Sequence, residues 1–181
     1  MTLKLSKITK NDYKAVKKLY LSAFPREERP PFFMLKSGVK KGSGDFFVAK
    51  DGEIFVGFAY IVTHADLAYL FYFAIDGELR GKGYGSAVLT ELKEIYKGKR
   101  FFLAREMLEP DAENYSERVK RREFYLKNGF TDLPVKIKEA SVTFDVMGVD
   151  CSVKKEEYDE MMTAFCGKLI RKLVDMRMIE D

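Results

Sequence analysis

Residues 70–86, LFYFAIDGELRGKGYGS, hold three predicted structural elements in direct succession. The first half is a run of apolar residues, which predicts a strand buried on both faces. The second half has glycines at positions 81, 83 and 85. A helical pattern follows at once, with Val88, Leu89 and Leu92 on one face. The sequence therefore predicts a buried strand, a glycine-rich loop and a helix that begins where the loop ends.

The glycine-rich loop predicts a binding site for phosphate groups. Glycine has no side chain to keep a ligand away from the backbone. The first N–H groups of a helix have no acceptor within that helix and favour anions. Positive charge from Arg80 and Lys82 adds to this effect. The residues expected to hold the anion are Arg80, Gly81, Lys82, Gly83, Tyr84, Gly85 and Ser86.

Two common phosphate-binding motifs do not fit this loop. A P-loop has four residues between its first glycine and its Gly-Lys pair, whereas only residues 78–80 separate Gly77 from Gly81. A dinucleotide-binding loop has the spacing G-x-G-x-x-G, which Gly81, Gly83 and Gly85 do not match. Both alternatives are excluded.

The rest of the chain predicts one mixed α/β domain, α+β-like, over residues 1–181. Antiparallel strands are expected on both sides of the turn at Asp51-Gly52. A further antiparallel pair is expected within 135–147, where polar and apolar residues alternate. A last helix is expected at about 154–178. Its apolar face indicates core or dimer packing and leaves a homodimer open, and it consists of Tyr158, Met161, Met162, Phe165, Leu169, Leu173 and Met176.

Composition argues against several classes of protein. The 181 residues carry a formal charge of +4 with the two signs interspersed, whereas a nucleic-acid-binding protein usually has a clustered basic stripe. No apolar run approaches the roughly 20 residues that span a bilayer. The N-terminus lacks the apolar stretch of a secretory signal. Cys151 and Cys166 lack metal-ligand spacing. We expect a cytoplasmic protein without a metal, a nucleic-acid partner or a membrane partner.

Two motifs resemble those of the GNAT superfamily of N-acetyltransferases. Arg80, Gly83 and Gly85 form R-x-x-G-x-G, which resembles the acyl-CoA loop of that family, Q/R-x-x-G-x-G/A. Downstream, FYLKNGF at 124–130 is similar to the F-Y-x-x-x-G-F of the same family. The expected order of strands and helices also resembles the family's fold over nearly the whole chain. The resemblance implies acetyl-CoA as cosubstrate and direct acetyl transfer to a primary amine in a ternary complex.

The resemblance also implies roles for particular residues. The backbone of Phe73, Ala74 and Ile75 is expected to pair with the pantetheine arm, and the Phe73 amide to polarise the acetyl carbonyl. Tyr125 matches the family's general acid, which protonates the departing thiolate. Arg118 stands where the family often has an asparagine, which leaves the contacts of that helix with pantetheine open.

The general base and the acceptor are less well defined. Tyr69 stands where some family members have a glutamate, so Glu106 is the expected substitute. Glu28, the lone His64 and a chain of water molecules are alternatives. Residues 25–32, PREERPPF, are expected to line the acceptor pocket, where Glu28 would attract a cationic amine. The acceptor is expected to be a small-molecule or peptide amine. A CoA-binding sensor without turnover is the alternative function, because the glutamate at position 69 is absent.

Overall fold

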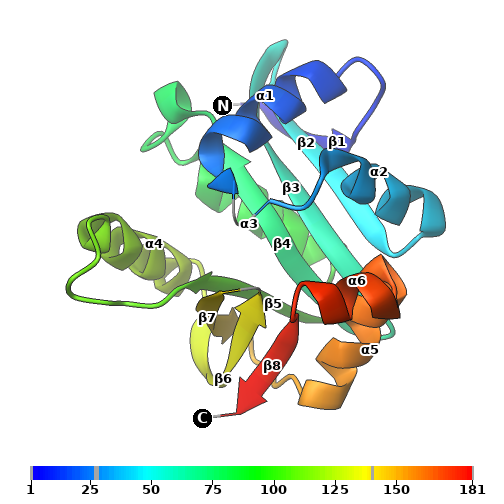
Figure 1. Ribbon diagram of the computed structural model, residues 1–181. Helices are drawn as coiled ribbons and strands as arrows, with labels where there is room; N and C mark the ends of the chain where they lie inside the picture. The colour runs from blue at the N-terminus through cyan, green and yellow to red at the C-terminus, as the bar shows by residue number, and fades with distance from the viewer. Residues whose placement is uncertain (1, 27–28, 140, 181) are drawn as a thin grey trace. The chain divides into compact units, whose positions relative to one another are not determined.

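A computed structural model describes residues 2–26, 29–139 and 141–180 (Figure 1). The fold is mixed α/β, as predicted, with an eight-stranded, mostly antiparallel sheet in the order β1-β2-β3-β4-β5-β7-β6-β8. The chain forms two compact units, residues 1–63 with 70–97 and residues 64–69 with 98–181. The interpretation of residues 1–181 as a single domain stays a prediction.

The first unit contains four strands and three α-helices. The Asp51-Gly52 turn joins β2 and β3 in an antiparallel hairpin, as the sequence predicts. Met34 lies in the helix α2. The elements are β1 (Leu3–Lys7), α1 (Tyr13–Ala23), α2 (Phe32–Lys41), β2 (Gly44–Asp51), β3 (Ile54–His64), β4 (Leu67–Ile75), the 3-10 turn η2 (Gly77–Leu79) and α3 (Tyr84–Ile95).

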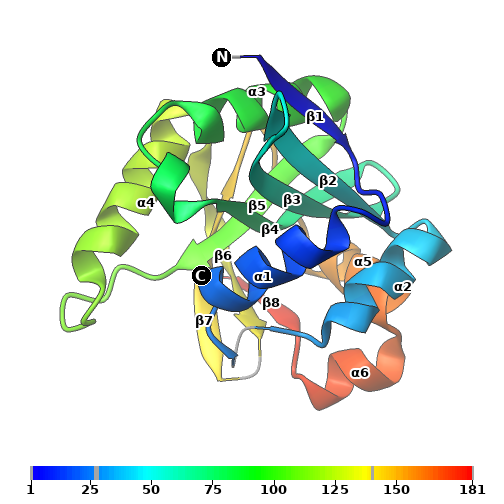
Figure 2. The same cartoon turned by 90° about the horizontal axis from the view of Figure 1, so that it is seen from above.

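Alternation along β2 sends neighbouring aromatic rings to opposite faces of this unit's strands. Phe46 lies 5.7 Å from Phe58 and 6.0 Å from Phe32 of α2, between ring centroids. Phe47 faces the other way and lies 6.4 Å from Tyr96, which ends α3. Thus α1 and α2 cover one face of these strands and α3 covers the other (Figure 2).

In the second unit, neighbouring aromatic rings on β5 also point to opposite faces of the strand. Phe102 stacks on Tyr69 at 4.8 Å, and Tyr69 lies 6.2 Å from Tyr158 of α5. Phe101 contacts Phe130 at 5.7 Å, just after α4. Burying both rings fixes α4 and α5 on opposite faces. The elements of this unit are β5 (Arg100–Glu106), α4 (Tyr115–Lys127), β6 (Thr131–Glu139), β7 (Val142–Gly148), α5 (Lys155–Cys166), α6 (Lys168–Leu173) and β8 (Arg177–Glu180).

The prediction of one helix over 154–178 was wrong. Gly167 has φ 87° and ψ 154°, a conformation outside the helical region that ends α5 and starts the short α6. The chain then pairs β8 with β6. Leu169 and Leu173, predicted to share the buried face of α5, are 73% and 75% exposed. No helix in the described ranges is long and apolar enough to cross a membrane.

Candidate functional site

The glycine-rich loop leaves several backbone donors without acceptors. Gly81 and Gly83 have φ values of +75° and +84°, and a Cβ atom at either would meet no atom within 4 Å. The first helical hydrogen bond of α3 runs from the Ala87 N–H to the Gly83 carbonyl, at 3.1 Å. Among the described residues, the amides of residues 84–86 therefore have no acceptor within the helix. This arrangement fits a phosphate or diphosphate group.

Two cations flank the free amides. The Nε of Arg80 donates to the Ile75 carbonyl at 3.3 Å, which draws the side chain back toward the end of β4. Lys82 is exposed at the tip of the loop. No carboxylate of residues 2–26, 29–139 and 141–180 forms an ion pair with either side chain. Their positive charge therefore remains available to an anion.

Tyr84 contributes its backbone to the loop, whereas its side chain is engaged elsewhere. Its hydroxyl donates to Asp51 Oδ2 at 2.6 Å, and the Thr2 N–H donates to Asp51 Oδ1 at 2.8 Å. The hydrogen bond from Tyr84 is the main reason that the pKa of Asp51 lies below its usual value. Asp51 therefore links the first residue of α3 to the β2–β3 hairpin.

The last residues of β4, predicted to pair with pantetheine, alternate between the two faces of the strand. Tyr72 is buried and contacts Tyr20 of α1 edge-on at 5.2 Å. Phe73, the next residue, is half-buried, and Ala74 and Ile75 are buried. The Asp76 N–H donates to the Val56 carbonyl at 2.9 Å, so the strand stays paired with β3 up to the loop.

Tyr125, the predicted general acid, lies on α4 in the second unit. Its ring contacts Phe124 and Phe130 at 5.3 and 5.7 Å, and the residue is 8% exposed. Burial raises the pKa of Tyr125 to about 12. Its hydroxyl makes no hydrogen bond within the described ranges of the chain. The phenol is thus held by its ring and keeps its proton at neutral pH.

Glu106, the predicted base, is held by a network at the end of β5. Its Oε1 accepts from Asn114 Nδ2 at 3.0 Å, and its Oε2 pairs with Arg121. Arg118 Nε lies 3.5 Å from Oε1 and donates to Asn114 Oδ1 at 2.8 Å. Arg118 also reaches Glu109 at 2.8 Å. Arg118, which stands at the family's asparagine position, therefore forms ion pairs with Glu106 and Glu109.

The other residues considered at the sequence level have distinct environments. Tyr69, at the position of the absent glutamate, is a core residue that stacks on Phe102. Glu28 lies outside the described residues. His64 ends β3 and is half-buried. No group of three histidine, cysteine, aspartate or glutamate side chains that could hold a metal occurs within the described ranges.

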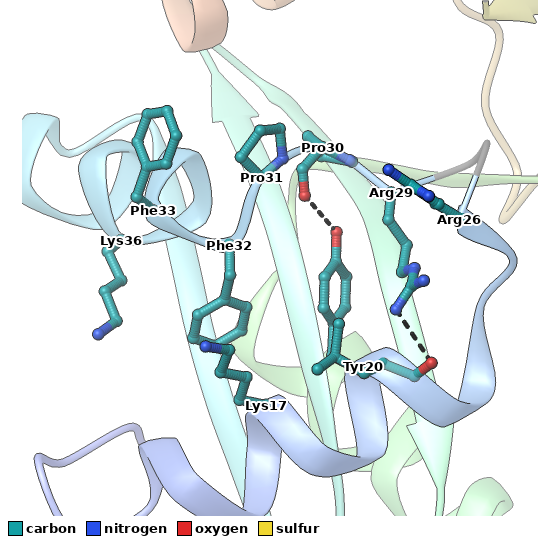
Figure 3. Close-up of a pocket in the computed structure, with 10 residues that line it drawn as sticks. Lys17, Tyr20, Arg26, Arg29, Pro30, Pro31, Phe32, Phe33 and Lys36 are labelled. Carbon is teal, nitrogen blue, oxygen red and sulfur yellow. Dashed lines mark hydrogen bonds between the residues drawn. The ribbon is translucent and has the colours of Figure 1, made fainter.

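A cavity of about 470 Å³ lies between α1, α2 and the segment that joins them (Figure 3). Sequence reasoning placed Arg29, Phe32 and Phe33 at such a rim but missed the other basic residues, which come from separate helices. The lining residues are Lys17, Tyr20, Leu21, Arg26, Arg29, Pro30, Pro31, Phe32, Phe33 and Lys36.

Comparisons with known proteins agree on one family. The family model described as an acetyltransferase (GNAT) domain matches residues 42–132. This range contains β2 to β5, the glycine-rich loop and α4 with Tyr125. No curated protein matches this sequence.

Several solved structures share the fold. A protein assigned to the GNAT acetyltransferases of Bacteroides thetaiotaomicron is 23% identical, with a TM-score of 0.71, covering 94% of this chain and 98% of that one. A Bacillus subtilis acetyltransferase in complex with CoA is 15% identical, with a TM-score of 0.58 and coverage of 83% and 98%. The ribosomal-protein-S18-alanine N-acetyltransferase of Escherichia coli is 19% identical, with a TM-score of 0.60 and coverage of 85% and 97%.

Proposed function

Because this chain belongs to the GNAT acetyltransferase family, we propose that it transfers the acetyl group of acetyl-CoA to a primary amine. One observation carries the proposal: the free amides of residues 84–86 begin a helix directly after two open, left-handed glycines. Such a helix start binds phosphate oxygens. Arg80 and Lys82 add charge for the diphosphate of CoA. Residues 80–86 are thus the proposed CoA loop, and the backbone of Phe73, Ala74 and Ile75 is the proposed pantetheine contact.

The proposed reaction needs three kinds of group from the protein. The amine nitrogen attacks the thioester carbonyl carbon, a C–N bond forms and the C–S bond breaks. The amine loses one proton, and the departing thiolate takes up one. The carbonyl oxygen gains negative charge and needs a fixed donor, for which the Phe73 amide is the candidate. The sulfur needs an acid and the amine needs a base.

Tyr125 is the proposed acid. A pKa of about 12 keeps its phenol protonated over the whole working range of such an enzyme. The hydroxyl has no hydrogen-bond partner among the described residues, so no internal bond must break before it donates. Its ring contacts with Phe124 and Phe130 fix its direction.

Glu106 remains the proposed base, with Glu28 as the proposed acceptor contact. Ion pairs with Arg118 and Arg121 hold the Glu106 carboxylate, the group that would accept the proton of the amine. The same ion pairs must loosen before the proton is transferred. This engagement, together with the tyrosine at position 69, favours one second candidate function, a CoA-binding sensor without turnover.

Two measurements separate these functions. Isothermal titration calorimetry with CoA tests the loop, and release of free thiol from acetyl-CoA over a panel of amines tests transfer. We expect heat of binding and amine-dependent thiol release. Binding without thiol release for any amine would favour the sensor, and the absence of binding heat would refute both candidates.

A charge-matched pair of double variants tests where CoA binds. Replacing Arg80 and Lys82 with glutamine is expected to weaken CoA binding by about tenfold or more, because charged hydrogen bonds to phosphate are lost. The control replaces Lys40 and Lys41, at the end of α2, and removes the same net charge. Equal loss of affinity in both double variants would contradict the assignment of the loop.

A further inference from the structure

The cavity between α1 and α2 is basic and aromatic. Four of its described lining side chains are cations, Lys17, Arg26, Arg29 and Lys36, and none of the described lining residues is acidic. Within the described ranges, no carboxylate forms an ion pair with any of the four. Over residues 17–36 the sequence has five basic residues and two glutamates, so the segment keeps a formal charge of +3. Positive charge therefore dominates this cavity.

The walls of the cavity are held in place by hydrogen bonds. The Tyr20 hydroxyl donates to the Pro30 carbonyl at 2.8 Å, and burial raises the pKa of Tyr20 to about 12. Arg29 donates from Nη1 to the Leu21 carbonyl at 3.0 Å and from Nε to the Pro25 carbonyl at 3.2 Å. A guanidinium has five N–H donors, and three of those of Arg29 have no acceptor among the described residues. Figure 3 shows the bond from Tyr20 to the Pro30 carbonyl and the bond from Arg29 to the Leu21 carbonyl.

Lys36 lies near two aromatic rings. Lys36 Nζ sits 4.1 Å from the ring centroid of Tyr13 and 5.7 Å from that of Phe32. Figure 3 shows Lys17 and Lys36 extending from different helices near Phe32. An anionic group bound here would meet ammonium groups from both helices, beside an apolar surface formed by Phe32.

A residue that lines the cavity contacts the strand that precedes the CoA loop, within the same unit. The Tyr20 ring contacts Tyr72 at 5.2 Å, and Phe24 contacts the same ring at 4.8 Å. Tyr72 directly precedes Phe73, whose amide is the proposed donor to the acetyl carbonyl. A molecule in this cavity would therefore lie against a wall shared with the proposed reactive strand.

We infer that this cavity binds an anionic group of the acceptor, and that the acceptor is a small amine carrying a carboxylate or a phosphate. The inference rests on the proposed acetyl transfer and specifies its substrate class. It departs from the expectation of a cationic acceptor attracted by Glu28, a residue outside the described ranges, because the described lining is positive. A polycationic amine would be repelled by the four cations, whereas an anion would gain charged hydrogen bonds.

The test compares amines that differ only in the anionic group. The pairs are phenylalanine and phenethylamine, 5-aminopentanoate and pentylamine, and O-phosphoethanolamine and ethanolamine, with spermidine as the polycation. Calorimetry on the protein saturated with CoA measures binding without turnover, and thiol release measures transfer. We expect at least one anionic member to bind about tenfold more tightly than its neutral partner. The carboxylate and phosphate pairs identify which anion is preferred.

Two double variants test whether the cavity causes the preference for the anionic amine. Lys17→Gln with Lys36→Gln removes two cations of the cavity, and Lys18→Gln with Lys40→Gln removes two exposed lysines of the same helices that do not line it. The first is expected to abolish the preference for the anionic member while CoA affinity stays unchanged. The second is expected to keep the preference. Thermal unfolding of both verifies that they fold.

The outcomes separate this inference from the proposed function. Failure to bind CoA would refute the proposed function itself. Normal CoA binding with equal affinity for both members of every pair would overturn only the anionic-acceptor inference. So would tighter binding of spermidine, or a preference that both double variants lose equally.

Discussion

The hydroxyl of Tyr84 donates a hydrogen bond of 2.6 Å to Oδ2 of Asp51, so a side chain at the end of β2 holds the first residue of α3. Tyr84→Phe removes this bond and keeps the ring. We expect CoA affinity to fall several-fold, because the amides that bind the phosphates begin at this residue. Calorimetry with CoA measures the effect.

The same helix offers a matched control at its other end. The Tyr96 hydroxyl donates to Asp45 Oδ2 at 2.5 Å and ties the end of α3 to β2. Tyr96→Phe should lower the melting temperature without changing CoA affinity. If Tyr96→Phe weakened CoA binding as much as Tyr84→Phe, the role of Tyr84 would be general stability and not positioning of the loop.

Gly83 provides a second test, because its backbone conformation and its open surroundings have separate consequences. Gly83→Ala places a Cβ in a left-handed conformation, at a cost to stability of about 1–2 kcal/mol. Gly42, with φ +74° and equally open surroundings, should lose a similar amount on the same substitution. Only Gly83→Ala should weaken CoA binding, by about tenfold or more, because only there does the methyl group meet the ligand. Urea unfolding and calorimetry on both variants measure the two effects.

Tyr125→Phe tests the proposed acid. Without the hydroxyl, the departing thiolate must take its proton from water, so kcat should fall by about 100-fold. The affinity for CoA should stay within about twofold, because the ring and its contacts remain. Steady-state kinetics and calorimetry measure the two quantities. An unchanged kcat would remove Tyr125 from the reaction.

The raised pKa of Tyr125 also predicts a change in stability at high pH. The unfolded phenol ionises near pH 10 and the folded one near pH 12. The contribution of this group to folding is thus complete below pH 10 and is lost as the pH rises toward 12. Over that window Tyr125→Phe should lose less stability than the parent, by about 1.4 kcal/mol per pH unit at most. Urea unfolding between pH 9 and 11 tests this, with the exposed Tyr115→Phe as control.

The order of elements around the glycine-rich loop was predictable because local chemistry dictates it. Nine buried or half-buried residues in succession define β4, and Gly83 permits the turn into α3. The β2–β3 hairpin follows from Asp51-Gly52 in the same way. These elements depend on short-range sequence patterns, which tertiary packing did not override.

The acceptor side could not be predicted to the same extent. Lys17 and Lys36 lie 19 positions apart in the sequence, on two different helices. Only the packing of α1 and α2 through Tyr20 and Phe32 brings them to one cavity. No pattern in the sequence indicates that these two side chains line the same cavity. In the sequence, the adjacent Glu27 and Glu28 of residues 25–32 favour the prediction of a cationic acceptor.

The C-terminal segment shows how periodicity misleads when a glycine interrupts it, and it supports a last prediction. Leu173 continues the helical spacing of Met161, yet Met161 is fully buried and Leu173 is 75% exposed, because Gly167 turns the chain between them. Met161→Ala should therefore cost about 2–5 kcal/mol, and Leu173→Ala less than about 0.5 kcal/mol. Urea unfolding of both variants at two protein concentrations measures this. A large cost for Leu173→Ala that grows with protein concentration would show that α6 is covered in a dimer, whereas a large cost independent of concentration would contradict the break at Gly167.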